Sequence, residues 1–210
     1  MSGKLLDVPY LTQPTDNTCQ STCLSMFAQY LEQKLMKSTP AGGKAIGDIW
    51  AEINTGDARP VKGRNAYENM RWWLEKHFSP PLKFEVASTR NPDEAIASVV
   101  ARIDRGYPVM VSTNHERTDG HIILVIGYEG YKAGMCDPNV RFVCHDPYGK
   151  FGPKLKSKQF GKRRYDQGMT LMAGGEVGPG KAVRYDYDGI HRIRSDKHSN
   201  GTYFLVSVKL

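Results

Sequence analysis

Residues 13–35 have the sequence QPTDNTCQSTCLSMFAQYLEQKL. After a turn-rich start, apolar residues recur at three- and four-residue spacing, which is the pattern of one buried helix face: Cys23, Phe27, Tyr30 and Leu31. The residues at 16–18 are Asp, Asn and Thr, three types that cap helix N-termini. We therefore predict a helix over residues 19–35 whose first turn contains Cys19.

Cys19 lies where a helix favours a nucleophilic thiolate. The unpaired backbone N–H groups of a helix N-terminus carry partial positive charge and stabilise an anionic sulfur. Gln13 lies six residues upstream, and its side-chain N–H together with the backbone N–H of Cys19 would form an oxyanion hole. These residues indicate a catalytic cysteine with Gln13 as oxyanion donor. A buried cysteine beside a loop glutamine is the alternative that this segment leaves open.

The second half of the chain supplies a base and a carboxylate. His121 follows a glycine and begins an apolar, strand-like run, and the next such run, at 140–144, leads into Asp146. A carboxylate at the end of a neighbouring strand is able to hold an imidazole in one tautomer. We predict Cys19, His121 and Asp146 as a catalytic set. His145 should point away from the site, because adjacent strand residues face opposite sides.

The remaining pattern places helices ahead of most of the strands. Helices are expected at 48–53, 66–78 and 92–105, and strands at 82–86, 107–113, 121–128, 140–144, 183–187, 191–194 and 203–208. This order predicts an α+β fold, with helices packed on a mostly antiparallel sheet. We expect residues 1–210 to form a single domain with a basic, glycine-rich excursion at about 147–183.

Composition excludes several classes of protein. Of the 210 residues, 40% are hydrophobic and 24% are charged, which excludes collagen-like and disordered chains. No apolar run approaches the length of a membrane span. The N-terminus has no signal-peptide core, so we expect a cytoplasmic protein or one released by lysis or a dedicated secretion system. Four cysteines are too few for a disulfide scaffold.

Several of these motifs together resemble one enzyme family. They are Val8-Pro9-Tyr10, Gln13, Cys19, Gly106-Tyr107-Pro108-Val109, Gly120-His121, Gly127-Tyr128 and His145-Asp146-Pro147. In this order they are similar to the C39-like branch of the papain-fold cysteine peptidases. The resemblance implies a papain-like fold, hydrolysis of an amide or peptide bond, and no cofactor. It also implies Cys19 as nucleophile, His121 as general base and acid, Asp146 as orienting residue and Gln13 as oxyanion donor.

Two features depart from the family pattern. Gln20 occupies the position after the nucleophile, where the family usually has glycine. The segment from Lys150 to Arg164 is strongly basic and contributes to a net charge of +7. We expect a mobile, solvated basic loop there, and contact with an anionic polymer is the alternative. Stand-alone proteins of this fold cleave proteins, isopeptide links or peptidoglycan cross-bridges. A peptide, protein or peptidoglycan substrate of a bacterial or phage system is therefore expected.

Two alternatives remain at this point. The first is a zinc site among Cys19, Cys23, Cys136, Cys144, His121 and His145, although their spacing matches zinc motifs poorly, so we expect no metal. The second is a catalytically inactive papain-fold module that binds through its basic surface. No motif for sequence-specific nucleic-acid binding accompanies that surface.

Overall fold

The computed structural model describes residues 2–15, 17–113, 121–132, 140–147, 180–185 and 202–210. Its helices are α1 (Cys19–Leu35), α2 (Ile46–Asn54), α3 (Tyr67–Phe78) and α4 (Pro92–Asp104). Its strands are β1 (Ser2–Leu5), β2 (Phe84–Thr89), β3 (Val109–Thr113), β4 (His121–Tyr131), β5 (Arg141–His145), β6 (Val183–Tyr185) and β7 (Tyr203–Val208). The α+β fold class predicted from the sequence is confirmed.

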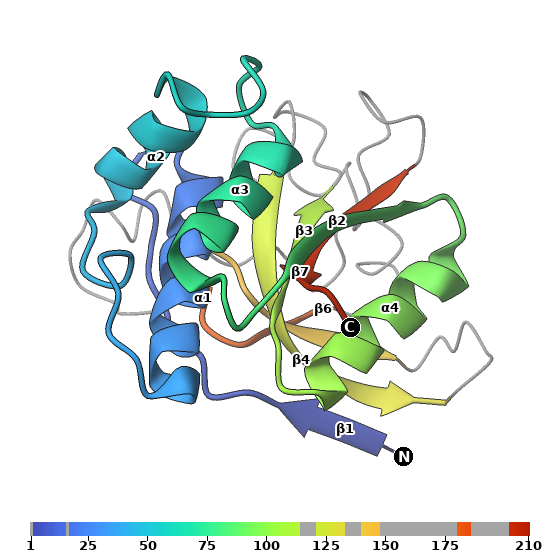
Figure 1. The fold of residues 1–210 in the computed structure, drawn as a ribbon. Helices are drawn as coiled ribbons and strands as arrows, with labels where there is room; N and C mark the ends of the chain where they lie inside the picture. Colours follow the sequence, from blue (N-terminus) through green and yellow to red (C-terminus); the bar gives the residue numbers. More distant parts are fainter. Residues whose placement is uncertain (1, 16, 114–120, 133–139, 148–179, 186–201) are drawn as a thin grey trace.

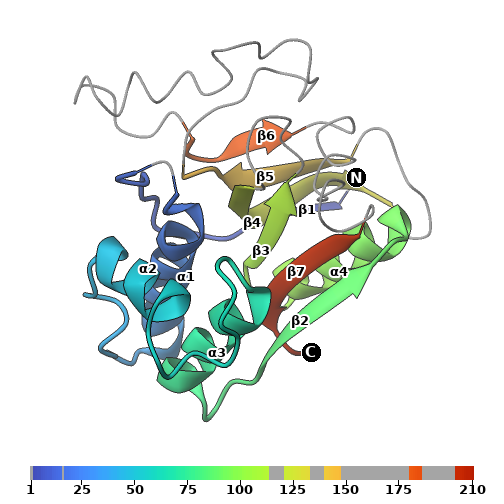
Figure 2. The ribbon, with the colours of Figure 1, turned by 90° about the horizontal axis from the view of Figure 1, so that it is seen from above.

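All described strands belong to one sheet, in the order β2-β7-β3-β4-β5-β6, with β1 added on β4. Every pairing is antiparallel. Figure 1 shows α1, α2 and α3 grouped to the left of the sheet and α4 to its right, and Figure 2 shows the strands side by side from above. The long strand β4 is therefore central, with β3 and β1 along one edge and β5 along the other.

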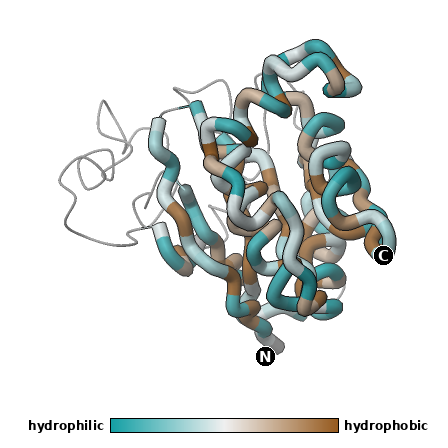
Figure 3. The backbone as a smooth tube through the Cα atoms, turned by 60° about the vertical axis from the view of Figure 1, so that its left-hand side comes forward, coloured by the Kyte–Doolittle hydropathy of each residue, from teal (hydrophilic) through white to brown (hydrophobic). Residues whose placement is uncertain are grey.

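The helices form where their sequence patterns place them. The range of α1 matches the predicted 19–35, and the three other helices lie within about two residues of their predicted ranges. Asn91 caps α4 as expected, because its side chain accepts a hydrogen bond from the backbone N–H of Asp93 at 2.9 Å. Hydrophobic residues, in brown in Figure 3, recur along the helices, as expected of elements that bury one face.

The core lies between α1 and the centre of the sheet. Both α1 and α4 contact β4, and every residue of β4 from His121 to Tyr128 is buried. A strand covered on both faces needs a continuous apolar run, which explains the sequence Ile-Ile-Leu-Val-Ile at 122–126. His121 begins this run and is held by a rigid, fully covered strand.

Some expectations are not met or lie outside the described residues. The leader carries turn signals and no strand pattern, whereas Ser2–Leu5 forms β1, a strand too short to recognise without its partner β4. The predicted strand at 191–194, the segment from Lys150 to Arg164, Cys136 and most of the excursion at 147–183 lie outside the described residues. The assignment of 1–210 to a single domain stays a prediction.

The pairing of β4 with β5 contains an irregularity at Ile126. Val125 pairs with Cys144, but the next pair joins Gly127 to Val143, so that one residue of β4 is extra. The backbone oxygen of Ile126 accepts a hydrogen bond from the N–H of Leu6 at 2.9 Å, which ties the N-terminal segment to this bulge. Beside it, β1 approaches so closely that a Cβ atom on Gly127 would lie 2.5 Å from the backbone oxygen of Lys4.

Gly127→Ala should therefore destabilise the protein. The added methyl group meets backbone atoms that cannot move without separating β1 from β4, and we expect a loss of about 1–3 kcal/mol in the free energy of unfolding. Chemical denaturation measures this loss. Gly43→Ala is the control, because a Cβ atom on Gly43 would have no neighbour within 4 Å, and it should change stability by less than about 0.5 kcal/mol. Equal effects of the two substitutions would contradict the prediction.

Candidate active site

Cys19 is the first residue of α1, and its side chain is buried. Thr18 occupies the N-cap position, but its side chain does not cap the helix, because Oγ1 donates a hydrogen bond to the backbone oxygen of Thr15 at 2.9 Å. The side-chain cap expected from residues 16–18 is thus not made by Thr18. The amides of the first turn are left for other acceptors, which favours an anionic sulfur there.

His121 and Asp146 form a buried pair. The distance between His121 Nε2 and Asp146 Oδ1 is 2.8 Å, and the two side chains are 3% and 0% exposed. The register of β4 and β5 brings these two residues together. Leu124 pairs with His145, and because the strands are antiparallel, the following residue, Asp146, lies opposite Ile123. Residues two apart on a strand share a face, and therefore His121 and Asp146 are diagonal neighbours on one face of the sheet.

The extra residue at Ile126 decides which face Asp146 occupies. If the register between Gly127 and Val143 continued without the bulge, Asp146 would lie opposite Leu124 and on the face away from His121. A shift of one residue reverses every side chain beyond it. The bulge is therefore the local feature that brings the carboxylate and the imidazole together.

The electrostatics of Cys19 and His121 favour an ion pair. Burial by itself raises the pKa of the Cys19 thiol, but the hydrogen bond with His121, its positive charge, and the backbone N–H groups of Ile122 and Gln20 lower the pKa below its ordinary value. Burial likewise lowers the pKa of His121, but the charge and hydrogen bond of Asp146, followed by those of Cys19, raise it to about 10. The two shifts together favour a thiolate beside an imidazolium.

Gln13 is brought to the same end of the sheet by the leader. Its backbone N–H donates to the oxygen of Pro147 at 2.8 Å, so it is anchored beside Asp146. Its buried side chain donates from Nε2 to the oxygen of Thr15 at 2.7 Å, the same oxygen that accepts from Thr18 Oγ1. This places the amide of Gln13 at the N-terminus of α1. One of its two N–H groups is used by Thr15.

Cys23, Cys144 and His145 have different surroundings from Cys19. Burial raises the pKa of both Cys23 and Cys144 well above the ordinary thiol value, and the sulfur of Cys23 contacts the backbone oxygen of Ile122 at 3.5 Å. His145 points away from Asp146 as expected: its Nε2 lies 2.9 Å from the oxygen of Val8, and its Nδ1 accepts from the N–H of Ala182 at 3.1 Å. The charge of Cys19 also raises the pKa of Cys23, so Cys23 is a neighbouring thiol that stays neutral.

Comparison with known proteins gives one family. The description "Peptidase_C39 like family" matches residues 5–169, a range that includes Gln13, Cys19, His121 and Asp146. The chain belongs to this family of C39-like peptidases. A crystal structure of a C39-like peptidase from Bacillus anthracis is similar to it, with a TM-score of 0.56 and 13% sequence identity, over 100% of this chain and 98% of the other. No curated protein sequence matches the chain.

Two tyrosines, Tyr10 and Tyr67, contribute to the surroundings of the candidate site in this C39-like chain. The sequence patterns do not predict either of them as a site residue. The hydroxyl of Tyr10 donates to the backbone oxygen of Asp146 at 3.1 Å, and its ring meets that of His145 edge-on at 5.2 Å. Tyr67 stacks on Phe204 with ring centres 4.7 Å apart. Burial raises the pKa of Tyr67, a hydrogen bond with Ser112 lowers it, and the charge of Cys19 raises it further, so that the net shift is upward. Tyr10 belongs to a family motif, whereas no local pattern marks Tyr67.

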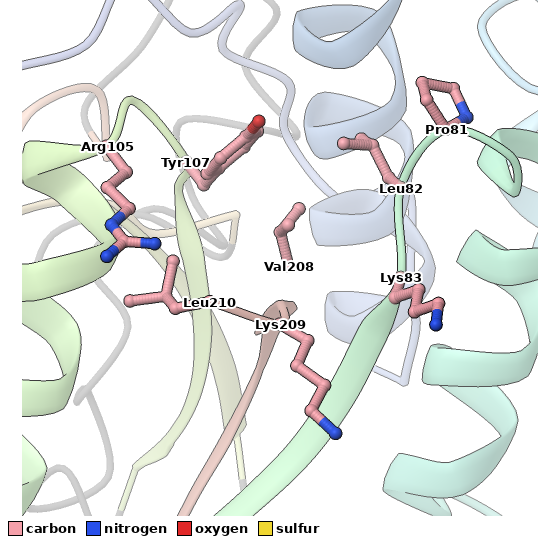
Figure 4. Close-up of a pocket in the computed structure, with 8 residues that line it drawn as sticks. All are labelled: Pro81, Leu82, Lys83, Arg105, Tyr107, Val208, Lys209 and Leu210. Atoms are coloured by element: carbon pink, nitrogen blue, oxygen red, sulfur yellow. The ribbon is translucent and has the colours of Figure 1, made fainter.

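Other kinds of site find little support in the described part of the chain. Among the described residues, no group of three or more His, Cys, Asp or Glu side chains could hold a metal ion, and no helix is long and apolar enough to cross a membrane. A cavity of about 710 Å³ lies between the ends of three segments that include Lys83, Tyr107 and Lys209 (Figure 4). Tyr107 precedes β3, whose other end pairs with His121, so this cavity is remote from Cys19.

The pH dependence of Cys19 alkylation tests the ion pair. Because the pKa of Cys19 is lowered, reaction with iodoacetamide should continue below the pH at which an ordinary thiol, with a pKa of about 8.5, stops reacting. His121→Ala removes the cation, so the thiolate forms only at higher pH and the rising limb of the rate profile shifts upward. His145→Ala is the control and should leave the profile in place. A shift in His145→Ala without one in His121→Ala would contradict the assignment.

Proposed function

We propose that this C39-like chain is a cysteine peptidase that cleaves an amide bond through Cys19, His121 and Asp146. The observation that carries the proposal is the buried His121–Asp146 contact, which raises the pKa of an imidazole hydrogen-bonded to the thiol of Cys19. A thiolate stabilised by an imidazolium and a helix N-terminus is the arrangement that nucleophilic cysteine catalysis requires.

In the first half-reaction, the Cys19 thiolate attacks the carbonyl carbon and the C=O electron pair moves to oxygen. The backbone N–H of Cys19 and the second N–H of Gln13 Nε2 donate to this oxyanion. Since His121 Nε2 contacts Asp146, we assign the other ring nitrogen, Nδ1, to proton transfer. The imidazolium gives its proton to the leaving nitrogen as the C–N bond breaks, and an amine and a thioester on Cys19 result.

In the second half-reaction, neutral His121 removes a proton from a water molecule, which attacks the thioester carbonyl. The tetrahedral intermediate again places its negative oxygen at the same donors. It collapses with cleavage of the C–S bond, releasing a carboxylic acid and restoring the thiolate and imidazolium. Asp146 keeps the ring in one orientation and stabilises its charged form throughout.

The bond that is cut belongs to a peptide or protein, because the family is one of peptidases. We propose a protein, an isopeptide link or a peptidoglycan cross-bridge of a bacterial or phage system. The net charge of +7 supports an anionic target, toward which a basic protein is attracted at low ionic strength. Contact through the segment from Lys150 to Arg164 is part of this proposal.

Cys19→Ala should abolish turnover without loss of the fold, because the nucleophile is removed and only a small cavity is left. Wild type and variant are compared on purified peptidoglycan and on a panel of folded and unfolded protein substrates. Cys23→Ser is the matched control: a serine hydroxyl retains a donor for the oxygen of Ile122, and activity should be largely kept. An inactive Cys23→Ser variant together with an active Cys19→Ala variant would refute the assignment. If the wild-type protein and Cys19→Ala both cleave no substrate, the result would support the inactive binding module.

Asp146→Asn should move the alkaline limb of the turnover profile. The protonated His121 is needed to release the amine, so activity falls as pH rises through the pKa of His121, which is about 10. Loss of the Asp146 charge lowers that pKa, and the fall should begin at lower pH. The measurement is kcat against pH. The rate at the optimum should decrease less than in His121→Ala, for which about 10²- to 10⁴-fold is expected. An unchanged alkaline limb would exclude the stabilisation of the His121 imidazolium by Asp146.

A further inference from the structure

Gln20, the residue after Cys19, has a buried polar side chain that the proposed mechanism does not use. It is 2% exposed, and its Nε2 lies 3.2 Å from Asn54 Oδ1 and 2.6 Å from Asn65 Oδ1. Asn54 ends α2, and Asn65 lies before α3 with a backbone φ of 59°. Three amides from separate parts of the chain therefore meet beside the first turn of α1.

The orientation of the Asn54 amide follows from its backbone partners. Its Nδ2 lies 3.0 Å from the oxygen of Trp50, and its Oδ1 lies 2.8 Å from the backbone N–H of Asn65. A backbone oxygen only accepts and a backbone N–H only donates, so this amide has one permitted orientation. The atom that Asn54 presents to Gln20 is thus an acceptor.

Gln20 must then present its NH2 group to both asparagines and its carbonyl oxygen to the other side. That oxygen faces Cys19, with 4.0 Å between Oε1 and Sγ. A carbonyl oxygen accepts a hydrogen bond from S–H but has no proton to offer to a thiolate. Its partial negative charge opposes the effect of the imidazolium on the same sulfur.

The other titratable groups around Cys19 come from four parts of the fold. His121 on β4 is the cation, and Asp146 after β5 is its counter-ion. Cys23 on α1 and Tyr67 on α3 interact with the charge of Cys19, and burial raises the pKa of both, so they stay neutral over the range in which Cys19 titrates. Among the described groups, the side-chain oxygen of Gln20 is an acceptor that acts against His121 at the sulfur, whereas the backbone N–H of Gln20 acts in the same direction as His121.

We propose that Gln20 is a positioning residue that stabilises the neutral thiol of Cys19 relative to the thiolate, with its amide held in one orientation by Asn54 and Asn65. This inference rests on the proposed function of Cys19. The resulting thiolate is more basic, and a more basic thiolate is more nucleophilic. When the sulfur bonds to the substrate carbonyl it loses its charge, and the repulsion from Oε1 ends.

Gln20→Met tests the proposal, because it keeps the length of the side chain and removes the carbonyl oxygen. The rate of Cys19 alkylation by iodoacetamide is measured against pH, with the modified residue located by mass spectrometry. The midpoint should move about half to one pH unit lower, so that below it the fraction of thiolate rises about three- to tenfold; after its lower nucleophilicity is included, the variant should react about two- to fourfold faster. At the alkaline plateau the variant should react about two- to threefold more slowly, since its thiolate is less basic.

Two further variants complete the test. Asn65→Gly removes the shorter of the two restraints, suits the positive φ and leaves Gln20 in place, so the midpoint should move in the same direction by a smaller amount. Asn65→Gly also tests the proposal if the Gln20→Met variant does not fold. Gln29→Met, on the same helix and hydrogen-bonded to Ser25, is the control and should change nothing. A structural defect alone would not raise the rate at low pH while lowering it at high pH.

The outcomes separate this inference from the proposed function. If His121→Ala raises the midpoint while Gln20→Met leaves it unchanged or raises it, the role of Gln20 is refuted and the Cys19–His121 pair stands. If His121→Ala has no effect on the midpoint, the proposed function fails, and with it the basis of this inference. A lower midpoint in Gln20→Met and Asn65→Gly, with Gln29→Met at the wild-type value, supports the orientation of the amide as the cause.

Discussion

The one-residue bulge at Ile126 is the constraint on which the site depends. Because side chains alternate along a strand, the parity of the β4–β5 register decides whether Asp146 faces His121 or the opposite side of the sheet. The bulge is held from outside: the N-terminal segment bonds to Ile126, and β1 crosses Gly127 at a distance that leaves no room for a side chain. In the described part of the chain the N-terminal strand β1 pairs with β4 alone, and it borders the bulge that brings His121 and Asp146 to the same face.

The same end of the sheet carries a balance of opposing influences on one sulfur. The imidazolium of His121 and the first-turn amides favour the thiolate, whereas burial and the carbonyl of Gln20 favour the thiol. A thiolate that is stabilised too strongly is a weak nucleophile, and one that is not stabilised at all is rarely present at neutral pH. A site that combines both influences keeps the thiolate populated and reactive.

The similarity to the Bacillus anthracis structure shows that this fold tolerates very different sequences, since only 13% of residues are identical. In this chain the proposed site depends on a few positions: Cys19 at a helix start, His121 at a strand start, Asp146 after the next strand, and Gly127 where β1 crosses β4. Buried core positions tolerate other apolar residues of suitable size. In this chain Gln20 follows Cys19, and its side chain is held by Asn54 and Asn65.

The sequence by itself determined the helices, most strands and the candidate residues, because helical periodicity, capping types and strand alternation are local patterns. The range of α1 and the placement of Cys19 at its first residue could be derived in this way. Only the tertiary structure decided that Ser2–Leu5 pairs with β4, that Thr18 leaves the first turn uncapped, and that Asn54 and Asn65 orient Gln20. Apart from the hydrogen bond of Thr18 with Thr15, which is local, these features join residues tens of positions apart, and a contact between distant segments leaves no periodic pattern in either one.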